Sequence, residues 1–420
     1  MNIYRNRKFV ILMSSKLISL YGSAIYEMAL VWFILSEYGE ASGTLLAWVV
    51  SLGFMPTVLF AGFAGAVVDK YNKKTILICS DLVSGILVGT LILVPGFGGE
   101  VYLLFVTAVL SLCASLASLT VTGMIQENVL YGECYSTEVL YIANSSNQFV
   151  ERTTLLLGFA TGGLLVAILG VPMVFLLNAL SFLGSAVINL MLEYSPSNTP
   201  EVSKLQGGLT GQLKKAWLYL RENRELFRLV ILGAIINMLW DPLILIVIPY
   251  VVKNVFSVSV TEFGLIQAAL PMGFCLGTIY LQYDSRWCKK PQIIRISIWT
   301  LNSMLILFII PMMLRGAFEK TEALAWYFEG VLGTCGIISA AINVTTSVVI
   351  QTLVPGYTLG KIQGIIKSFS AGLMPLGCAI FGLLIGNVEE YVLFLVPLAC
   401  IYLLVPFVPK FRLKVFQVTE

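Results

Sequence analysis

Histidine is absent from the 420-residue chain. Its absence excludes histidine-based catalysis, histidine metal ligands and a histidine proton switch. The eight cysteines are scattered, mostly in apolar stretches, and no two of them form a C-x-x-C pair. Neither a metal site nor a disulfide framework is therefore expected. Because no nucleophile constellation is present either, the sequence predicts no metal, no cofactor and no enzymatic activity.

Charged residues are scarce as well. They make up 12% of the chain, whereas hydrophobic residues make up 58%. A soluble globular domain carries about 25% charged residues. No basic tract is long enough to suggest nucleic-acid binding. This composition predicts a polytopic membrane protein with the lipid bilayer as its surroundings.

Long apolar runs are what the chain has in abundance. A membrane-spanning helix needs about 20 apolar residues, and the runs are too long and too continuously apolar for barrel strands. We therefore expect an all-α integral membrane protein with twelve transmembrane helices. The expected spans are 10–35, 44–68, 75–95, 101–124, 138–168, 172–192, 228–252, 261–283, 292–313, 323–349, 363–386 and 391–408.

The longest polar gap, from Glu193 to Phe227, divides these runs evenly. The sequence thus predicts an N-terminal six-helix bundle over residues 1–192, a central cytoplasmic linker over 193–227 and a C-terminal six-helix bundle over 228–420. An even division of this kind is typical of two structurally related, pseudo-symmetric halves.

Lysine and arginine in the loops predict the orientation. If the N-terminus is inside, the outer loops contain only Lys253, Arg315 and Lys320, and the other loop cations lie on the inner face. Both termini are therefore expected to be cytoplasmic.

A short basic loop joins the second and third apolar runs. It reads Gly65-x-x-x-Asp69-Lys70-x-x-Lys73-Lys74. Twelve helices in two sixes with this loop resemble the major facilitator superfamily, although the usual glycine after the basic residue is here Asn72. Further segments resemble the macrolide-efflux and siderophore-exporter branch of drug:proton antiporters. They are Ile142–Ser145, Phe175–Phe182, Gln351–Gln363 and Pro375–Gly377.

The resemblance implies a secondary active transporter in a bacterial cell membrane, with both six-helix bundles in the major facilitator fold. It also implies that Asp69 packs at the start of the eleventh helix, where the helix dipole stabilises a carboxylate. The expected conformational latch consists of Gly65, Asp69, Lys70, Lys73, Lys74 and Gln363. The positive-inside rule alone is the alternative; it explains the lysines but neither Gly65 nor Asp69.

Several charges lie inside expected membrane spans, where each costs about 2.5–3.5 kcal/mol at the helix centre on insertion scales. Glu27 and Asp241 fall on the first and seventh helices, which the resemblance implies line the transport cavity. Glu151 and Arg152 lie near the middle of the fifth helix, where a structural ion pair is the alternative. Lys16 is expected to reach the inner interface with its long side chain.

A carboxyl group in such a cavity can bind and release protons near neutral pH and can pair with a cationic drug. Both properties suit an antiporter in which proton and substrate compete for one acid. The expected proton and substrate site is Glu27, Asp241, Glu151 and Arg152, with Tyr26 and Trp240 added because each adjoins an acid.

Glycines form a cluster in the fifth helix at Gly158, Gly162 and Gly163. The segment resembles the antiporter signature of the superfamily, but it lacks the proline of that signature. Small residues at this spacing allow close helix packing. Close packing and an antiport-specific hinge remain alternative interpretations.

The sequence thus predicts proton-coupled efflux of a moderately hydrophobic small molecule, such as a drug, a macrolide or another natural product, by a monomer with alternating access. The segment Gly356–Ile362 is one residue short of a phosphate loop and lacks its Ser/Thr, so no Walker-type ATPase is encoded. The alternatives are a lipid flippase or importer of the same fold, or an accessory membrane protein without proton coupling.

Overall fold

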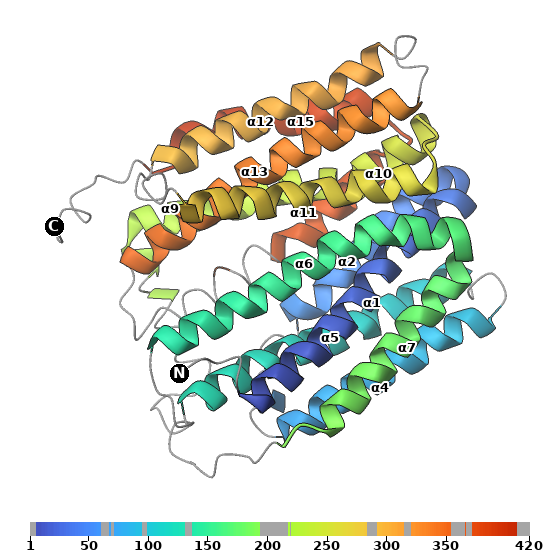
Figure 1. Cartoon of the computed structure of the whole chain (residues 1–420). Helices are drawn as coiled ribbons and strands as arrows, with labels where there is room; N and C mark the ends of the chain where they lie inside the picture. The colour runs from blue at the N-terminus through green and yellow to red at the C-terminus, as the bar shows by residue number, and fades with distance from the viewer. Residues whose placement is uncertain are drawn as a thin grey trace. The chain divides into compact units, whose positions relative to one another are not determined.

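The computed structural model describes residues 6–59, 67–68, 71–94, 99–130, 137–193, 217–218, 220–283, 292–314, 321–353, 366 and 372–409. Within these residues the regular structure is helical, apart from an isolated bridge between Ile385 and Val388. Figure 1 shows the helices along the chain. The longer ones are α1 (Arg7–Glu37), α2 (Ser42–Leu59), α4 (Lys73–Leu93), α5 (Gly99–Leu130), α6 (Thr137–Leu169), α7 (Val171–Leu190), α9 (Arg224–Pro242), α11 (Val260–Tyr283), α12 (Gln292–Met313), α13 (Thr321–Leu353) and α15 (Glu390–Leu404).

Ten helices in the described part are long and apolar enough to cross a membrane. Two shorter apolar helices, Ser42–Pro56 and Gly372–Leu384, accompany them. The expectation of an all-helical, multi-pass membrane protein is therefore confirmed. One span, Arg224–Val255, is composite: α9 continues through a π-helical segment, the short α10 (Ile248–Tyr250) and a second π-helical segment.

Local sequence signals define several helix ends. The Asn72 side chain accepts hydrogen bonds from the backbone N–H groups of Lys74 and Thr75, which caps the start of α4. Asn223 caps α9 in the same way through the N–H of Leu226. Between α6 and α7, Gly170 adopts a φ of 79°, a conformation that favours glycine, and Pro172 follows in the first turn of α7.

The chain divides into two compact units. Unit 1 comprises residues 1–33 and 52–206, and unit 2 comprises residues 34–51 and 207–420. The short segment 34–51, which spans the end of α1 and the first part of α2, thus packs with unit 2 although its sequence neighbours belong to unit 1.

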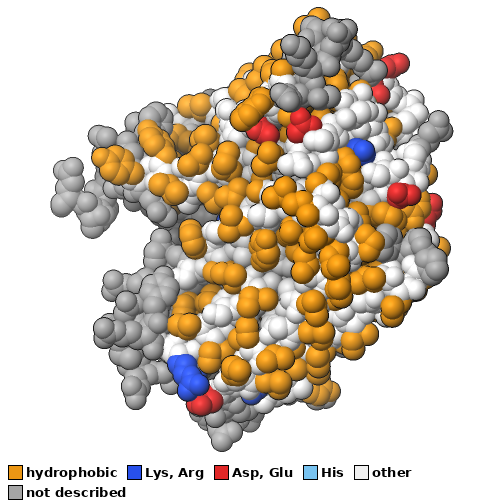
Figure 2. Space-filling view, turned by 45° about the vertical axis from the view of Figure 1, so that its right-hand side comes forward, with side chains coloured by type: hydrophobic (Ala, Val, Ile, Leu, Met, Phe, Trp, Pro, Cys, Tyr) orange, Lys and Arg blue, Asp and Glu red, His pale blue; other side chains and the backbone are white. Residues whose placement is uncertain are grey.

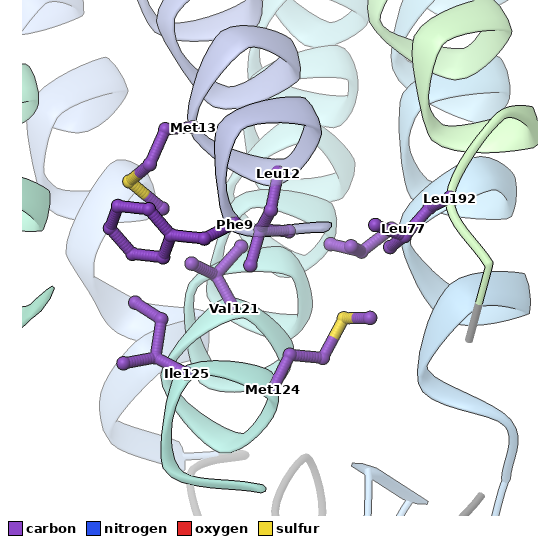
Figure 3. Packing of buried hydrophobic residues seen from close by; sticks show 8 residues of the cluster. All are labelled: Phe9, Leu12, Met13, Leu77, Val121, Met124, Ile125 and Leu192. Atoms are coloured by element: carbon purple, nitrogen blue, oxygen red, sulfur yellow. The ribbon is translucent and has the colours of Figure 1, made fainter. Parts of the chain in front are cut away.

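In unit 1, α4 packs mainly against α7 and α5. Figure 3 shows a buried hydrophobic cluster in which side chains of α1 and α5 point toward one another, with Leu77 of α4 close to Leu192 just beyond α7. The cluster consists of Phe9, Leu12, Met13, Leu77, Val121, Met124, Ile125 and Leu192. Burial of these side chains holds the corresponding ends of α1, α4 and α5 together.

In unit 2, α11 and α13 approach so closely that glycine is required at the contact. A Cβ atom added to Gly336 would collide with backbone atoms of Leu270, Gly273 and Phe274. Small residues at helix interfaces allow this close approach in membranes. Nearer the start of α13, Phe328 packs on Phe308 of α12 with ring centroids 5.9 Å apart, and Phe308 stacks on Phe394 of α15 at 5.7 Å.

The first part of α2 packs within unit 2 against the helix at residues 372–384. Thr44 Oγ1 donates a hydrogen bond to the Gly382 carbonyl at 3.0 Å, and a Cβ atom on Gly382 would meet the side chain of Ala47. Asn254 Nδ2 donates to Ser42 Oγ at 3.0 Å. These contacts explain why this segment belongs to unit 2.

Large hydrophobic side chains are exposed along most of the helices. Ile86, Val101, Phe149, Ile168 and Val187 are examples in unit 1. Figure 2 shows hydrophobic side chains spread over the visible face, with few acidic or basic ones among them. A surface of this kind suits the hydrocarbon core of a bilayer.

Candidate functional site

Glu27 lies on α1 in unit 1, and its side chain is exposed. One side of α1 contacts α6, because a Cβ atom on Gly158 would collide with Ala24 and one on Gly162 would lie 3.2 Å from Met28 Cβ. Glu27 is about 100° around the helix from Met28. Among the described residues, no side chain forms a hydrogen bond or ion pair with the Glu27 carboxylate.

Tyr26, the neighbour of Glu27, points about 100° away from it around α1 and is buried. Its ring packs on Phe175 of α7 with centroids 4.9 Å apart. Its hydroxyl has no hydrogen-bond partner within the described part of the chain, and it lies in electrostatic range of Glu27. Glu27 thus lies on the exposed side of α1, and the adjacent Tyr26 lies in the interior of unit 1.

Glu151 of α6 binds a cation from α1. Lys16 Nζ lies 2.6 Å from Glu151 Oε1 and donates a second hydrogen bond to Asn147 Oδ1 at 2.5 Å. Lys16 therefore pairs inside unit 1, and the expectation that it reaches for the membrane interface was wrong. The reason is that the carboxylate one helix away removes the need to reach water. Arg152, on the same helix, is exposed.

We expect the Lys16–Glu151 pair to contribute to stability. Losing one partner costs about 3–5 kcal/mol for a buried pair and about 0–1 kcal/mol for an exposed one. The side chains are 9% and 42% exposed, respectively. Replacing Lys16 with methionine is therefore expected to cost an intermediate amount, about 1–3 kcal/mol, measured as a lower unfolding temperature in detergent.

A charge swap is the control for this prediction. Lys16→Glu combined with Glu151→Lys should recover most of the stability that either single change removes. If the two single changes and the swap all unfold at the wild-type temperature, the pair contributes nothing.

Two glycines of α6, Gly158 and Gly162, lie at the contact with α1. Gly158, Gly162 and Gly163 are buried, and any side chain at Gly158 would overlap Ala24. Tyr21 of α1 also shares a hydrogen bond with Thr161 at 2.8 Å. This geometry accounts for Gly158 and Gly162 through close packing, and a hinge role for the three glycines remains a prediction.

In unit 2, Asp241 is half-buried near the middle of the composite span, and Trp240 beside it is buried. Pro242 follows and begins the π-helical segment Leu243–Val247. Proline lacks the N–H of a regular helix, and π-helical turns are frequent at functional sites. No hydrogen bond or ion pair to Asp241 is formed by a side chain in the described ranges.

The helix at residues 372–384 covers this position closely. A Cβ atom on Gly377 would collide with the carbonyl of Met238 and lie 3.0 Å from Pro242 Cγ. The next residue, Cys378, is in electrostatic range of Asp241 and interacts with Ser51 of α2. The group shown near Asp241 in the described part of unit 2 is thus a neutral thiol, that of Cys378.

The expected latch is described only in part. Gly65, Asp69, Lys70 and Gln363 lie outside the described residues. Lys74 donates a hydrogen bond to the carbonyl of Leu190 at 2.7 Å, which places a cation at the C-terminal end of α7 where the helix dipole favours it. Lys73 lies on the first turn of α4, beside Gly123 of α5. Both contacts are inside unit 1.

One buried acid escaped the sequence reasoning. Asp81 of α4 is 6% exposed and accepts hydrogen bonds from Ser185 and Asn189 of α7. A single carboxylate two turns inside an otherwise apolar run was the signal that could have revealed it.

Comparison with known proteins places these residues in a family. The model of the transmembrane secretion effector family matches residues 2–420. The chain belongs to this family of the major facilitator superfamily. The resemblance found in the basic loop and the later helices is therefore confirmed.

Relatives of this chain include efflux proteins. Macrolide efflux protein A of Streptococcus pyogenes is 22% identical over 414 residues, with 96% of each chain covered. The multidrug efflux pump Tap of Mycolicibacterium fortuitum is 23% identical, with 93% of each chain covered. The relatives are transporters and not enzymes.

Solved structures share the fold. The crystal structure of the nucleoside transporter NupG has a TM-score of 0.70 and 15% identity, and the match covers 98% of this chain and 100% of that one. At this identity the likeness shows the fold alone. The chain is thus a multi-pass membrane protein with the fold of these transporters.

Proposed function

We propose that this protein exports a moderately hydrophobic small molecule in exchange for protons. The observation that carries the proposal is a carboxyl group in each unit, Glu27 on α1 and Asp241 on the composite span, that has no cationic partner among the described residues. An ionisable residue within a membrane span is expensive, and it normally marks a substrate path or proton relay.

The architecture that we propose for this activity has twelve spans in two six-helix bundles, residues 1–192 and 228–420. Ten long apolar helices and the two shorter ones at Ser42–Pro56 and Gly372–Leu384 support that number. The excess of Lys and Arg in the inner loops supports cytoplasmic termini. The bacterial relatives support a bacterial plasma membrane.

The proposed transport cycle follows from competition between the proton and the substrate for the same carboxylates. When the transporter is open to the cytoplasm, an ionised carboxylate, Glu27 of unit 1 or Asp241 of unit 2, attracts a cationic substrate, while Tyr26 and Trp240 are buried beside these acids. After the units rock to face outward, a proton from outside binds the carboxylate, the charge that held the substrate is neutralised, and the substrate leaves. Return of the protonated form releases the proton to the cytoplasm.

The substrate class rests on the relatives. Macrolide efflux protein A and the multidrug efflux pump Tap span nearly the same length as this chain. An apolar molecule with a basic nitrogen, as many drugs have, would match carboxylates that lie among aromatic and aliphatic side chains.

A susceptibility panel tests this function. The chain is expressed in a bacterial host that lacks its own major pumps, and growth is measured against macrolides and other amphipathic cationic drugs. We expect resistance to at least one such drug and loss of its efflux when a protonophore collapses the proton gradient. Efflux that persists with a protonophore, or no change in susceptibility to any compound, would overturn the proposal.

A further inference from the structure

Asp81 has an environment unlike that of the other acids in unit 1. Ser185 Oγ donates to Asp81 Oδ2 at 2.7 Å and Asn189 Nδ2 donates to the same oxygen at 3.0 Å. All three residues are at most 6% exposed. Ser19 of α1 also interacts with the carboxylate. The site is therefore built from three helices, α1, α4 and α7.

Neutral groups provide all of the described contacts to Asp81. From α7 it is faced by Ser185 and Asn189, from α5 by the thiol of Cys113, and from α1 by Ser19. Lys16, a cation of α1, is bound to Glu151 instead. A carboxylate buried without a cation is costly to keep ionised, which makes it a site that binds a proton readily.

A line of polar side chains continues from Asp81 along α7. Asn178, Ser181, Ser185 and Asn189 follow one another at helical spacing, so that they share one face over roughly 16 Å. The part of this face that holds Asn178 and Ser181 contacts α1. A Cβ atom on Gly22 of α1 would collide with Ser181 and lie 2.8 Å from Asn178 Oδ1. The line thus runs between α1 and α7.

Three buried polar atoms along this line have no partner in the described part of the protein. They are Asn189 Oδ1, Asn178 Nδ2 and the hydroxyl oxygen of Tyr26. Buried polar atoms without a protein partner are normally hydrogen-bonded to internal water. Tyr26 packs on Phe175, one turn before Asn178, and adjoins Glu27. The polar line therefore extends from Asp81 toward Tyr26, the sequence neighbour of Glu27, through groups that water can bridge.

We propose that Asp81 is a second proton-binding residue of this transporter, which exchanges protons with Glu27 along the Tyr26–Asn178–Asn189 line. The step is a plain proton transfer: an O–H bond of a hydrated proton breaks as an O–H bond forms at Asp81, and the reverse follows on release. The inference rests on the proposed proton-coupled function.

Asn189 suits both protonation states of Asp81. Its amide N–H donates to the ionised carboxylate, as observed. After a rotation of the amide, its oxygen accepts a hydrogen bond from the protonated acid. The site therefore needs no movement of a helix to accept a proton.

The test uses the full-length protein in liposomes with a substrate found in the susceptibility panel, in sodium-free buffer. In Asp81→Asn, we expect transport driven by a pH gradient to fall toward that of protein-free vesicles. Exchange of labelled for unlabelled substrate without a gradient should continue. Asp81→Glu, which keeps the acid, should restore gradient-driven transport.

The outcomes separate this inference from the function on which it rests. A wild-type protein that ignores the pH gradient overturns the proposed function. If the wild-type and Asp81→Asn proteins respond equally to the gradient, only the inference about Asp81 is overturned. A wild-type protein that requires sodium would also contradict a proton at this site.

A measurement on the wild-type protein covers the case in which Asp81→Asn does not fold. A hydrophobic carbodiimide reacts with protonated carboxyl groups, and peptide mass spectrometry locates the adduct. We expect labelling of Asp81 that falls as the pH rises through the range in which transport changes. Labelling that is absent or constant across that range would show a structural acid and overturn the inference.

Discussion

Transport coupled to protons is expected to disappear when Glu27 is replaced with glutamine. The amide keeps the size and hydrogen-bonding capacity of the side chain, but it neither binds a proton nor carries the charge that attracts a cationic substrate. In energised membrane vesicles, efflux of the cationic drug should drop to the level of vesicles without the protein. Because the Glu27 carboxylate has no ion-pair partner among the described residues, the unfolding temperature should change little.

Glu37→Gln is the matched control. Glu37 is the last residue of α1 and is exposed, so the same change of charge occurs on the same helix away from the site. This variant should transport like the wild type. Full, pH-dependent efflux by Glu27→Gln would remove Glu27 from the proton and substrate site and shift that role to another acid, Asp241 first.

Folding of unit 2 should fail when a side chain larger than hydrogen is placed at Gly336. The valine variant would collide with backbone atoms of α11, which cannot rotate away as a side-chain end can. Overpacking a tight core costs about 1–3 kcal/mol and occasionally more, and here we expect about 3 kcal/mol or more because the obstacle is backbone. The measurements are the yield of monodisperse protein and its unfolding temperature.

Gly330 provides the comparison on the same helix. A Cβ atom at Gly330 has no neighbour within 4 Å among the described atoms, so Gly330→Val should leave yield and unfolding temperature close to the wild-type values. Equal losses of yield and unfolding temperature in both variants would show that valine acts through helix propensity or membrane insertion. They would contradict an effect through the α11–α13 contact.

The helices could be predicted from the sequence because one physical requirement dominates them. A helix that crosses the hydrocarbon core needs about 20 mostly apolar residues. This requirement produces a long apolar run in the sequence, whatever the helix packs against. The expected span 292–313 coincides with α12, and 261–283 differs from α11 by one residue. The composite span around Pro242 was predicted as one helix, since π-helical turns have no comparable sequence signal.

The partners of charged side chains could not be predicted in the same way. Lys16 and Glu151 are 135 residues apart in the chain, and only the packing of α6 on α1 brings them together. Asp81 was overlooked for a related reason. Its polar partners, Ser185 and Asn189, lie more than 100 residues away, so that no local pattern distinguishes it.

The central claim is that protons drive export through membrane-embedded carboxyl groups. The most direct measurement places the purified protein in liposomes, imposes a pH gradient and follows both the substrate and the internal pH. We predict that substrate moves against its own gradient toward the acidic side while protons move the opposite way, and that Glu27→Gln abolishes both fluxes. Substrate movement that is equally fast without the gradient, or that changes no proton flux, would contradict the account.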